Sequence, residues 1–207
     1  MNEVQLQSPR VFVVHEDPSV RESIESAIRG GGWPAETFQD LKEYLARRKA
    51  DGPSCLIVDP STLGRCCMEV QDRIAGDRSH IPVIFVLGRA ETLVFVRATK
   101  TGEIEYIGKP YGDEALLAAV SESIERSRAA LQAREKARAA REGYETLTPR
   151  EREVMGLVAS GLLNKQVGGE LGISEITVKT HRGNVMRKMK AKSFAHLVHM
   201  AAELRAS

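Results

Sequence analysis

Five short strand-like segments, each followed by a stretch with helical spacing, constrain the fold of the first half of this chain most strongly. The strongest of them, residues 55–58 and 81–87, are apolar throughout rather than alternating with polar residues. Continuous apolar strands are typical of parallel sheets whose faces are both covered by helices. Five β-α units in about 120 residues predict an α/β domain with a doubly wound, five-stranded parallel sheet, in which sites lie at the carboxyl ends of the strands. The expected strands are 11–14, 36–38, 55–58, 81–87 and 105–107, and the expected helices are 19–29, 40–48, 67–75, 91–101 and one that begins near Gly112.

The segment 112–142 contains no proline and predicts one long helix. Apolar residues recur every seven positions along it, but Ser127 and Arg134 occupy the positions three residues later that would complete an apolar seam. We therefore expect the first half to pack on the sheet and the second half, rich in Ala, Arg and Glu, to extend as a spacer. The weak seam leaves a coiled-coil dimer open as an alternative. The predicted boundaries are 9–125 for the first domain, 126–143 for a helical linker and 144–207 for the last domain.

The composition is that of a globular chain with room for two domains, since 207 residues include 42% hydrophobic and 28% charged ones. The longest apolar run, 81–87, is too short to span a bilayer, and the first residues lack the pattern of a secretory signal. We therefore expect a cytoplasmic protein without membrane contact. Its three cysteines are then expected to be reduced, and the adjacent Cys66 and Cys67 leave a redox sensor open.

Charge is distributed unevenly along the chain. Residues 144–207 contain 10 Lys and Arg against 6 Asp and Glu, whereas the remaining residues contain 20 against 22. Within 174–192 there are six cations and one acid. A local surplus of this kind favours a polyanionic partner, although a solvated helix face would give the same count.

The C-terminal residues predict only helices. Thr148-Pro149-Arg150-Glu151 has the order of a helix start, with a capping hydroxyl, a proline at the first helical position and a glutamate three residues after the cap. Three more helices are expected at 164–171, 174–189 and 193–204.

The second and third of these four helices meet the requirements of a helix-turn-helix. Such a pair needs a small residue on the first helix, a glycine in the turn and an apolar anchor on the second helix. Gly168, Gly172 and Val178 satisfy these requirements. Gly172 suits a left-handed C-terminal cap, and Ser174 can cap the helix that follows.

The third helix separates an apolar side from a polar one. With about 100° between successive residues, Val178, Val185 and Met189 fall together and must face the core. Cations, a hydroxyl and a glycine on the opposite side suit the major groove of DNA, although a basic surface helix of a structural bundle is the alternative. The residues of that side are Lys179, Thr180, Gly183 and Arg187, with Asn184 at the edge and with Arg182 and Lys188 at the flanks, in reach of phosphates.

These residues also carry a family resemblance. The stretches 147–154, Asn164-Lys165, Thr177-Val178-Lys179-Thr180-His181 and Lys188-Met189 resemble the LuxR-type helix-turn-helix of NarL/FixJ response regulators, FixJ-like members above all. The resemblance implies a four-helix domain whose third helix enters the major groove, and a dimer on a two-fold-related DNA site. By position it places Lys179, Thr180 and Gly183 at the bases and Thr177, His181 and Arg182 near the backbone. Gly183 departs from the longer residue common at its position.

The first domain resembles a receiver domain with a flavodoxin-like fold over nearly its whole length. Asp59 follows the third strand, where receivers carry the phosphoacceptor aspartate. Lys109-Pro110 follows the fifth strand, where the lysine of receivers contacts the phosphoryl group. Tyr106 occupies the position of the aromatic residue that responds to activation. The resemblance implies a sensor histidine kinase as a partner.

Other receiver positions differ in this chain. Receivers place two adjacent acids after the first strand, whereas this chain has His15 and Glu16, with Asp17 one step further on. Imidazole is a poor ligand for Mg²⁺, which weakens the magnesium candidate on Glu16 and Asp59, and no other cofactor is indicated. Leu87 replaces a Ser or Thr whose hydroxyl would bind the phosphoryl group and couple it to the aromatic residue.

We therefore predict a DNA-binding transcriptional response regulator of a bacterial two-component system, with a receiver that depends weakly or not at all on phosphorylation. The expected partners are double-stranded DNA, a sensor histidine kinase or another protein, and a second copy of the chain at least on DNA. A conventional regulator activated at Asp59 and a protein-interaction adaptor stay as alternatives. We do not expect an enzyme, because the sequence offers no nucleophile-base pair, phosphate-cradling glycine loop or metal cluster.

Overall fold

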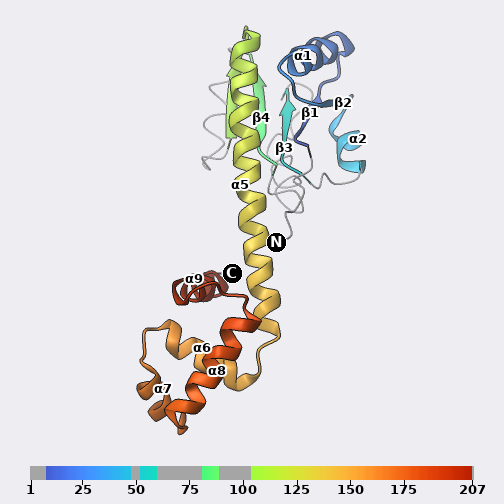
Figure 1. Cartoon of the computed structure of the whole chain (residues 1–207). Coiled ribbons are helices and arrows are strands. Elements are labelled where there is room, and N and C mark those ends of the chain that lie inside the picture. Colours follow the sequence, from blue (N-terminus) through green and yellow to red (C-terminus); the bar gives the residue numbers. More distant parts are fainter. Residues whose placement is uncertain (1–7, 48–51, 60–80, 89–103, 207) are drawn as a thin grey trace. The chain divides into compact units, whose positions relative to one another are not determined.

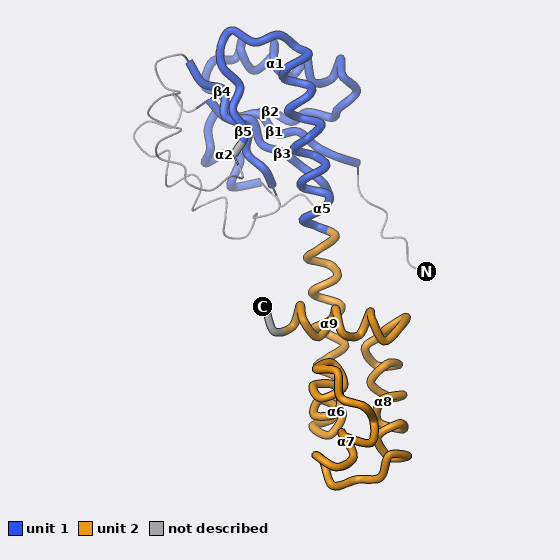
Figure 2. Tube along the Cα trace, turned by 90° about the vertical axis from the view of Figure 1, so that its left-hand side faces the viewer, with its two compact units in different colours: residues 1–131 blue, residues 132–207 orange. Residues whose placement is uncertain are grey.

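The computed structural model describes residues 8–47, 52–59, 81–88 and 104–206. The chain forms two compact units, residues 1–131 and 132–207 (Figure 2). Helix α5, Asp113–Glu145, belongs to both of them, because its first part packs in the core of the first unit and its end packs in the core of the second.

The first unit is built on a five-stranded sheet in which every neighbouring pair of strands is parallel and the order is β2-β1-β3-β4-β5 (Figure 1). This confirms the fold predicted from the apolar runs. The expected helices at 67–75 and 91–101, and the pair Cys66 and Cys67, lie outside the described residues. The strands are β1 Arg10–Val14, β2 Ala35–Phe38, β3 Ser54–Val58, β4 Val83–Leu87 and β5 Ile104–Gly108.

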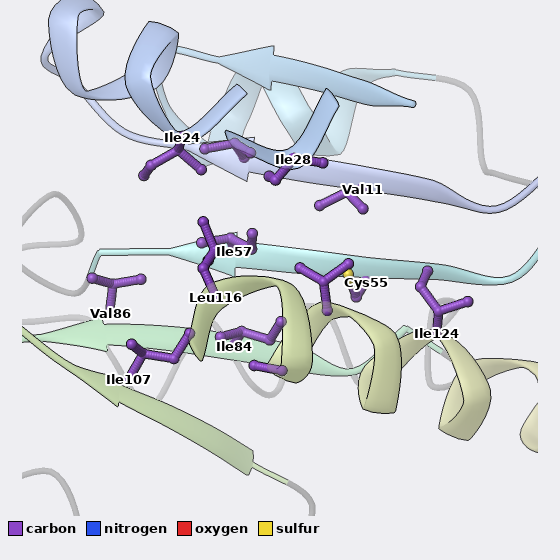
Figure 3. Packing of buried hydrophobic residues seen from close by; sticks show 13 residues of the cluster. Val11, Ile24, Ile28, Cys55, Ile57, Ile84, Val86, Ile107, Leu116 and Ile124 are labelled. Atoms are coloured by element: carbon purple, nitrogen blue, oxygen red, sulfur yellow. The ribbon is translucent and has the colours of Figure 1, made fainter. Parts of the chain in front are cut away.

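Helices cover both faces of this sheet. On one face α1, Pro18–Gly30, and the first part of α5 pack against inward-pointing strand residues, and Figure 3 shows Ile24 and Leu116 of these helices around Ile57 of β3. Cys55 is buried in this cluster, and burial raises the pKa of its thiol, so it is not a reactive thiolate. On the other face α2, Leu41–Ala46, contributes Tyr44 to a second buried cluster. The alternation of strand side chains between two covered faces accounts for the continuous apolar runs.

The strand register brings two predicted site residues together. Val14 of β1 pairs with Val58 of β3, and His15 and Asp59 directly follow these two residues. The next residue beyond β5 at the same edge is Lys109, whose N–H donates to the Leu87 carbonyl (2.8 Å). The carboxyl ends of the strands therefore bring these residues to one edge of the sheet.

Packing of α5 on the sheet continues beyond the boundary predicted at residue 125. Ser127 is fully buried, and its Oγ accepts a hydrogen bond from the Ser54 N–H (3.0 Å). Close by on α5, Ser123 and Arg126 both donate to the Glu105 carboxylate of β5. A small polar side chain is buried at little cost when a hydrogen bond satisfies it. The expectation that the helix has little to bury from Ser127 onward did not take this hydrogen bond into account.

The second unit is helical throughout, as predicted. Its core brings together Val154, Val167, Val178, Val185 and Leu197, one or two from each helix. The predicted spacer ends in this core, because Ala140 of α5 is fully buried there. No helix of the described residues combines the length and the apolar character needed to cross a membrane. The four helices that follow α5 are α6 Pro149–Ala159, α7 Asn164–Leu171, α8 Glu175–Lys188 and α9 Phe194–Ala206.

Candidate nucleic-acid interface and receiver site

A three-residue turn joins α7 to α8. Gly172 caps α7 in the left-handed conformation with φ +65°, where an L side chain is strained. Ser174 caps α8, because its Oγ accepts the Thr177 N–H (3.1 Å). The Arg150 guanidinium of α6 donates to the Leu171 carbonyl at the end of α7. The turn is therefore fixed at both of its helix ends, as the glycine and serine in the sequence predict.

Gly168 allows α7 to approach this turn closely. The Ile173 N–H donates to the Gly168 carbonyl (3.0 Å), and a Cβ placed on Gly168 would lie 2.8 Å from the Ile173 carbonyl oxygen. Real Cβ atoms do not approach a backbone oxygen so closely. The adjacent Gly169 is exposed, and a Cβ placed on it would have no atom within 4 Å. Only the first of these two glycines is thus required by packing.

Helix α8 follows α7 and the turn between them (Figure 1), and its side chains divide into a buried apolar side and an exposed polar side. Val178 and Val185 are fully buried and Met189 nearly so, which agrees with the apolar side predicted from the sequence. The residues expected on the opposite side are exposed, and they are Lys179, Thr180, Gly183 and Arg187.

The contacts of this exposed face leave most of it open. Lys179 forms only an exposed ion pair with Glu175 one turn earlier (Nζ to Oε1, 3.3 Å) among its described contacts. Such pairs contribute little free energy, so a phosphate or base can replace the carboxylate. The Thr180 hydroxyl donates to the Ile176 carbonyl (3.1 Å). A side chain placed on Gly183 would meet no atom within 4 Å, so this position is open to an approaching duplex.

The flanking residues are held more tightly. The Arg182 guanidinium donates to Asn164 Oδ1 at the start of α7 (3.2 Å) and lies 4.4 Å from the centre of the Phe194 ring. His181 is half-buried, and its Nδ1 has no hydrogen-bond partner within the described chain. Thr177 and Asn184 are also half-buried. These positions border the exposed face without forming part of it.

Lys188 has a role inside the domain that differs from the predicted phosphate contact. Its ammonium lies 2.6 Å from Glu151 Oε2 and donates to the Thr146 carbonyl (3.1 Å). Glu151 is buried and also accepts the Thr148 N–H (2.9 Å), while Thr148 caps α6 in return, forming the predicted capping box. Hydrogen bonds from Lys188 and from the Thr148 backbone lower the pKa of Glu151 below its ordinary value.

We expect Glu151→Gln to destabilise the second unit at neutral pH by roughly 1 to 2 kcal/mol, because glutamine keeps the capping box but loses the charged hydrogen bond. A lowered pKa stabilises the fold above the ordinary glutamate value of 4.5, and this contribution is lost as the pH falls through the lowered pKa. Unfolding of both proteins measured from neutral to acid pH should therefore show a difference that narrows with acidification. A constant difference would contradict a role for the carboxylate charge.

In the receiver, a histidine and a lysine contact the same oxygen of Asp59. His15 Nε2 lies 3.4 Å from Asp59 Oδ2, and the Lys109 ammonium forms an ion pair with that oxygen. Both Asp59 and His15 are buried. The imidazole therefore occupies the space beside the candidate phosphoacceptor where the resemblance predicts an acid.

Hydrogen bonds fix the orientation of this imidazole. His15 Nδ1 accepts the Asp17 N–H (3.0 Å), so the neutral ring carries its proton on Nε2, which faces the Asp59 carboxylate. The Arg21 guanidinium donates to the carbonyls of His15 (2.6 Å) and Glu16 (2.9 Å). The loop after β1 is thus held with a hydrogen-bond donor, not an oxygen ligand, directed at Asp59.

The described residues around Asp59 do not fit a magnesium ion. Mg²⁺ requires oxygen ligands in an octahedral arrangement. Asp17, which could replace the missing acid, caps α1 instead, because its Oδ1 accepts the Ser19 N–H (2.8 Å). Glu16 is exposed. Within the described ranges, no three His, Cys, Asp or Glu side chains gather as a metal-ligand set.

Leu87 is directed into the core. It is fully buried in the cluster that includes Val58 and Phe85, and Tyr106 packs against the same cluster while remaining half-buried. A leucine side chain offers no hydroxyl to an anion at the sheet edge. Leu87 therefore belongs to the apolar cluster against which Tyr106 packs.

Sequence reasoning missed two residues and one ion pair of these sites. Arg21 was overlooked because its contacts are with backbone carbonyls, which leave no side-chain pattern. The ion pair of Glu151 with Lys188 joins residues far apart in the sequence. Ile176 was not assigned to either side of α8, although the helical spacing from Lys179 and Thr180 would have placed it on the exposed face.

Both units match known protein families. Residues 11–121 match the response regulator receiver domain, and residues 145–201 match the bacterial regulatory proteins of the luxR family. The chain is 41% identical to Nodulation protein W of Bradyrhizobium diazoefficiens, over 94% of this chain and 86% of that protein. It is 32% identical to the transcriptional regulatory protein FixJ of Rhizobium meliloti, over 92% and 94%.

A solved structure extends this likeness to the whole chain. The response regulator StyR, in a low-resolution structure, aligns with a TM-score of 0.78 and 37% identity over 95% of this chain and 99% of that one. One family model matches each unit, and a relative above 30% identity aligns with 94% of the chain. The likeness is therefore not confined to one domain. The chain therefore belongs to the DNA-binding transcriptional response regulators of two-component systems, in which a receiver precedes a LuxR-type helix-turn-helix, and it is not an enzyme.

Proposed function

We propose that the exposed face of α8 binds the major groove of DNA and that the receiver controls this binding without phosphoryl transfer to Asp59. DNA and a kinase are the partners that the two domain families imply. The contact of His15 and Lys109 with one oxygen of Asp59 is the observation that carries the second part of this proposal.

The groove-binding part of the proposal is supported by the division of α8 into a buried apolar side and an exposed polar side. Its apolar side anchors it in the core, and the Gly172 turn sets its crossing with α7. Lys179, Thr180 and Arg187 then point away from the core, where cations and hydroxyls can contact base edges. We assign Arg182, His181 and Thr177 to the phosphate backbone beside the groove. Lys188 is left to its ion pair within the domain.

The phosphate-independent part is supported by two substitutions and by the role of Asp17. His15 places a proton donor on the nucleophilic carboxylate, Leu87 offers no hydroxyl, and Asp17 serves as a helix cap. A carboxylate oxygen that an ammonium pairs with and an imidazole nitrogen faces at 3.4 Å is a poor nucleophile toward a phosphodonor. We infer that contacts with another protein, such as the kinase, set the activity of this receiver.

We further propose a cytoplasmic protein that binds a two-fold-related DNA site as a dimer. Response regulators act on chromosomal DNA, and a second copy would double the number of phosphate and base contacts. Most of residues 132–139 on α5 are exposed, so this part of the helix is open to contact with a second copy.

Incubation with acetyl phosphate and Mg²⁺ tests the phosphate-independent part. We expect the mass of the intact protein and its affinity for a selected duplex to stay unchanged, within about twofold for affinity. His15→Asp restores the adjacent acids and should gain a phosphoryl group, and the gain should disappear in His15→Asp with Asp59→Ala. A conventional receiver would instead show stoichiometric addition to the unmodified chain, lost in Asp59→Ala, together with tighter DNA binding.

A further inference from the structure

Ile176 is the most exposed large hydrophobic side chain among the described residues, at 76%. The two others differ in setting. Phe194 is partly covered by the Arg182 guanidinium, and Leu163 lies in the turn before α7. Ile176 is the second residue of α8 and contributes nothing to the core. An isoleucine in the first turn of a helix that is otherwise polar on this side is not explained by folding.

The helical spacing places Ile176 on the proposed DNA-binding face. Lys179 and Thr180 follow it by three and four residues, and Gly183 by seven, so all four lie along one stripe. All four are exposed. The Thr180 hydroxyl donates a hydrogen bond to the Ile176 carbonyl. The Thr180 side chain therefore offers a ligand its methyl group and the lone pairs of its oxygen. The stripe therefore offers apolar groups at Ile176 and Thr180 beside the Lys179 ammonium.

We propose that Ile176 determines sequence specificity by packing against the C5-methyl group of a thymine in the major groove. This inference rests on the proposed docking of α8. Of the groups that base pairs present in the major groove, only the thymine methyl is apolar. A polar base edge opposite Ile176 would lose water without gaining a hydrogen bond, and that is unfavourable. The first turn of a recognition helix is also the part that reaches base edges in helix-turn-helix complexes.

The arrangement also predicts where the thymine lies. Because Ile176 precedes Lys179 by about one turn of helix, its thymine should neighbour the base pair that Lys179 contacts. Lysine prefers the guanine acceptors of the major groove. Each half-site should thus contain a thymine within one or two base pairs of a guanine.

Replacing thymine by deoxyuridine removes the methyl group and nothing else, and this tests the inference. Duplexes selected from a random pool by the full chain are resynthesised with deoxyuridine at each thymine in turn, and the affinity is measured. We expect about a fourfold loss at one position of each half-site, the effect of one buried methyl group. Ile176→Ala should bind the thymine and deoxyuridine duplexes equally. Leu163→Ala, which truncates a similarly exposed residue outside α8, should keep the fourfold difference.

Other outcomes separate this inference from the proposed function. If Ile176→Ala keeps the full preference for thymine, or if no position discriminates, Ile176 does not read the base, even though Lys179→Ala weakens binding. If Lys179→Ala and Ile176→Ala both leave affinity and selected sequence unchanged, the docking of α8 itself is wrong.

Discussion

Replacing Lys179 by glutamate should lower the affinity of the full chain for its selected duplex by more than about a hundredfold. Loss of a base contact costs about 1 to 3 kcal/mol, and the new carboxylate beside Glu175 would add repulsion from the phosphates. The present Lys179 side chain is exposed and has no role in the core, so folding should be unaffected. Equilibrium binding by fluorescence anisotropy measures the loss.

Lys136→Glu is the matched control for this experiment. Lys136 is exposed on α5 and its reversal changes the net charge by the same amount. We expect this control to bind within a few-fold of the unmodified chain. The unmodified chain should also lose affinity steeply as salt rises, with a logarithmic slope of about −0.9 per phosphate contact. Equal losses in Lys136→Glu and Lys179→Glu would show that only overall charge matters.

Alanine at two adjacent glycines of α7 should have opposite effects on the stability of the second unit. A Cβ at Gly168 would lie 2.8 Å from the Ile173 carbonyl oxygen, and relief of such a clash costs about 1 to 3 kcal/mol. A Cβ at Gly169 meets nothing, so alanine there should stabilise the helix by up to about 1 kcal/mol. Hydrogen exchange of the Val178 amide in the full chain reports the opening of this unit separately from the receiver.

Gly168→Ala and Gly169→Ala serve as controls for each other, because both replace a glycine of α7 by alanine. DNA binding should weaken in Gly168→Ala and stay unchanged in Gly169→Ala, since only the first alters the crossing of α7 and α8. Faster exchange in both variants, or slower exchange in both, would mean that the close approach of Gly168 to Ile173 does not determine the stability of this helix pair.

Much of the fold could be predicted because local and long-range requirements agree. The strand at 55–58 is apolar on both sides since both faces of the sheet are covered, and Thr148 with Glu151 forms the capping box that the sequence indicates. Gly172 and Ser174 likewise mark the turn before α8. In these places a short run of residues contains the whole physical cause.

The sites could be predicted only where exposure follows from helical spacing. Lys179 and Thr180 are on the outer side of α8 for that reason. Lys188 was expected at the flank of the same face, yet a buried carboxylate from another helix binds it. The orientation of His15 depends on a hydrogen bond from the Asp17 N–H, and the burial of Ser127 depends on a hydrogen bond from the Ser54 N–H. No pattern in the sequence indicates either hydrogen bond. The sequence does not predict contacts that join residues distant in the chain or that use backbone atoms.

Methylation by dimethyl sulfate on a selected duplex tests the central claim most directly, because it reports guanine N7 in the major groove and adenine N3 in the minor groove. With the unphosphorylated full chain and no phosphodonor, we predict protection of guanine N7 that is lost with Lys179→Glu, and no change at adenine N3. Protection confined to adenine N3, or protection of guanine N7 that arises only after treatment with acetyl phosphate and Mg²⁺, would contradict it.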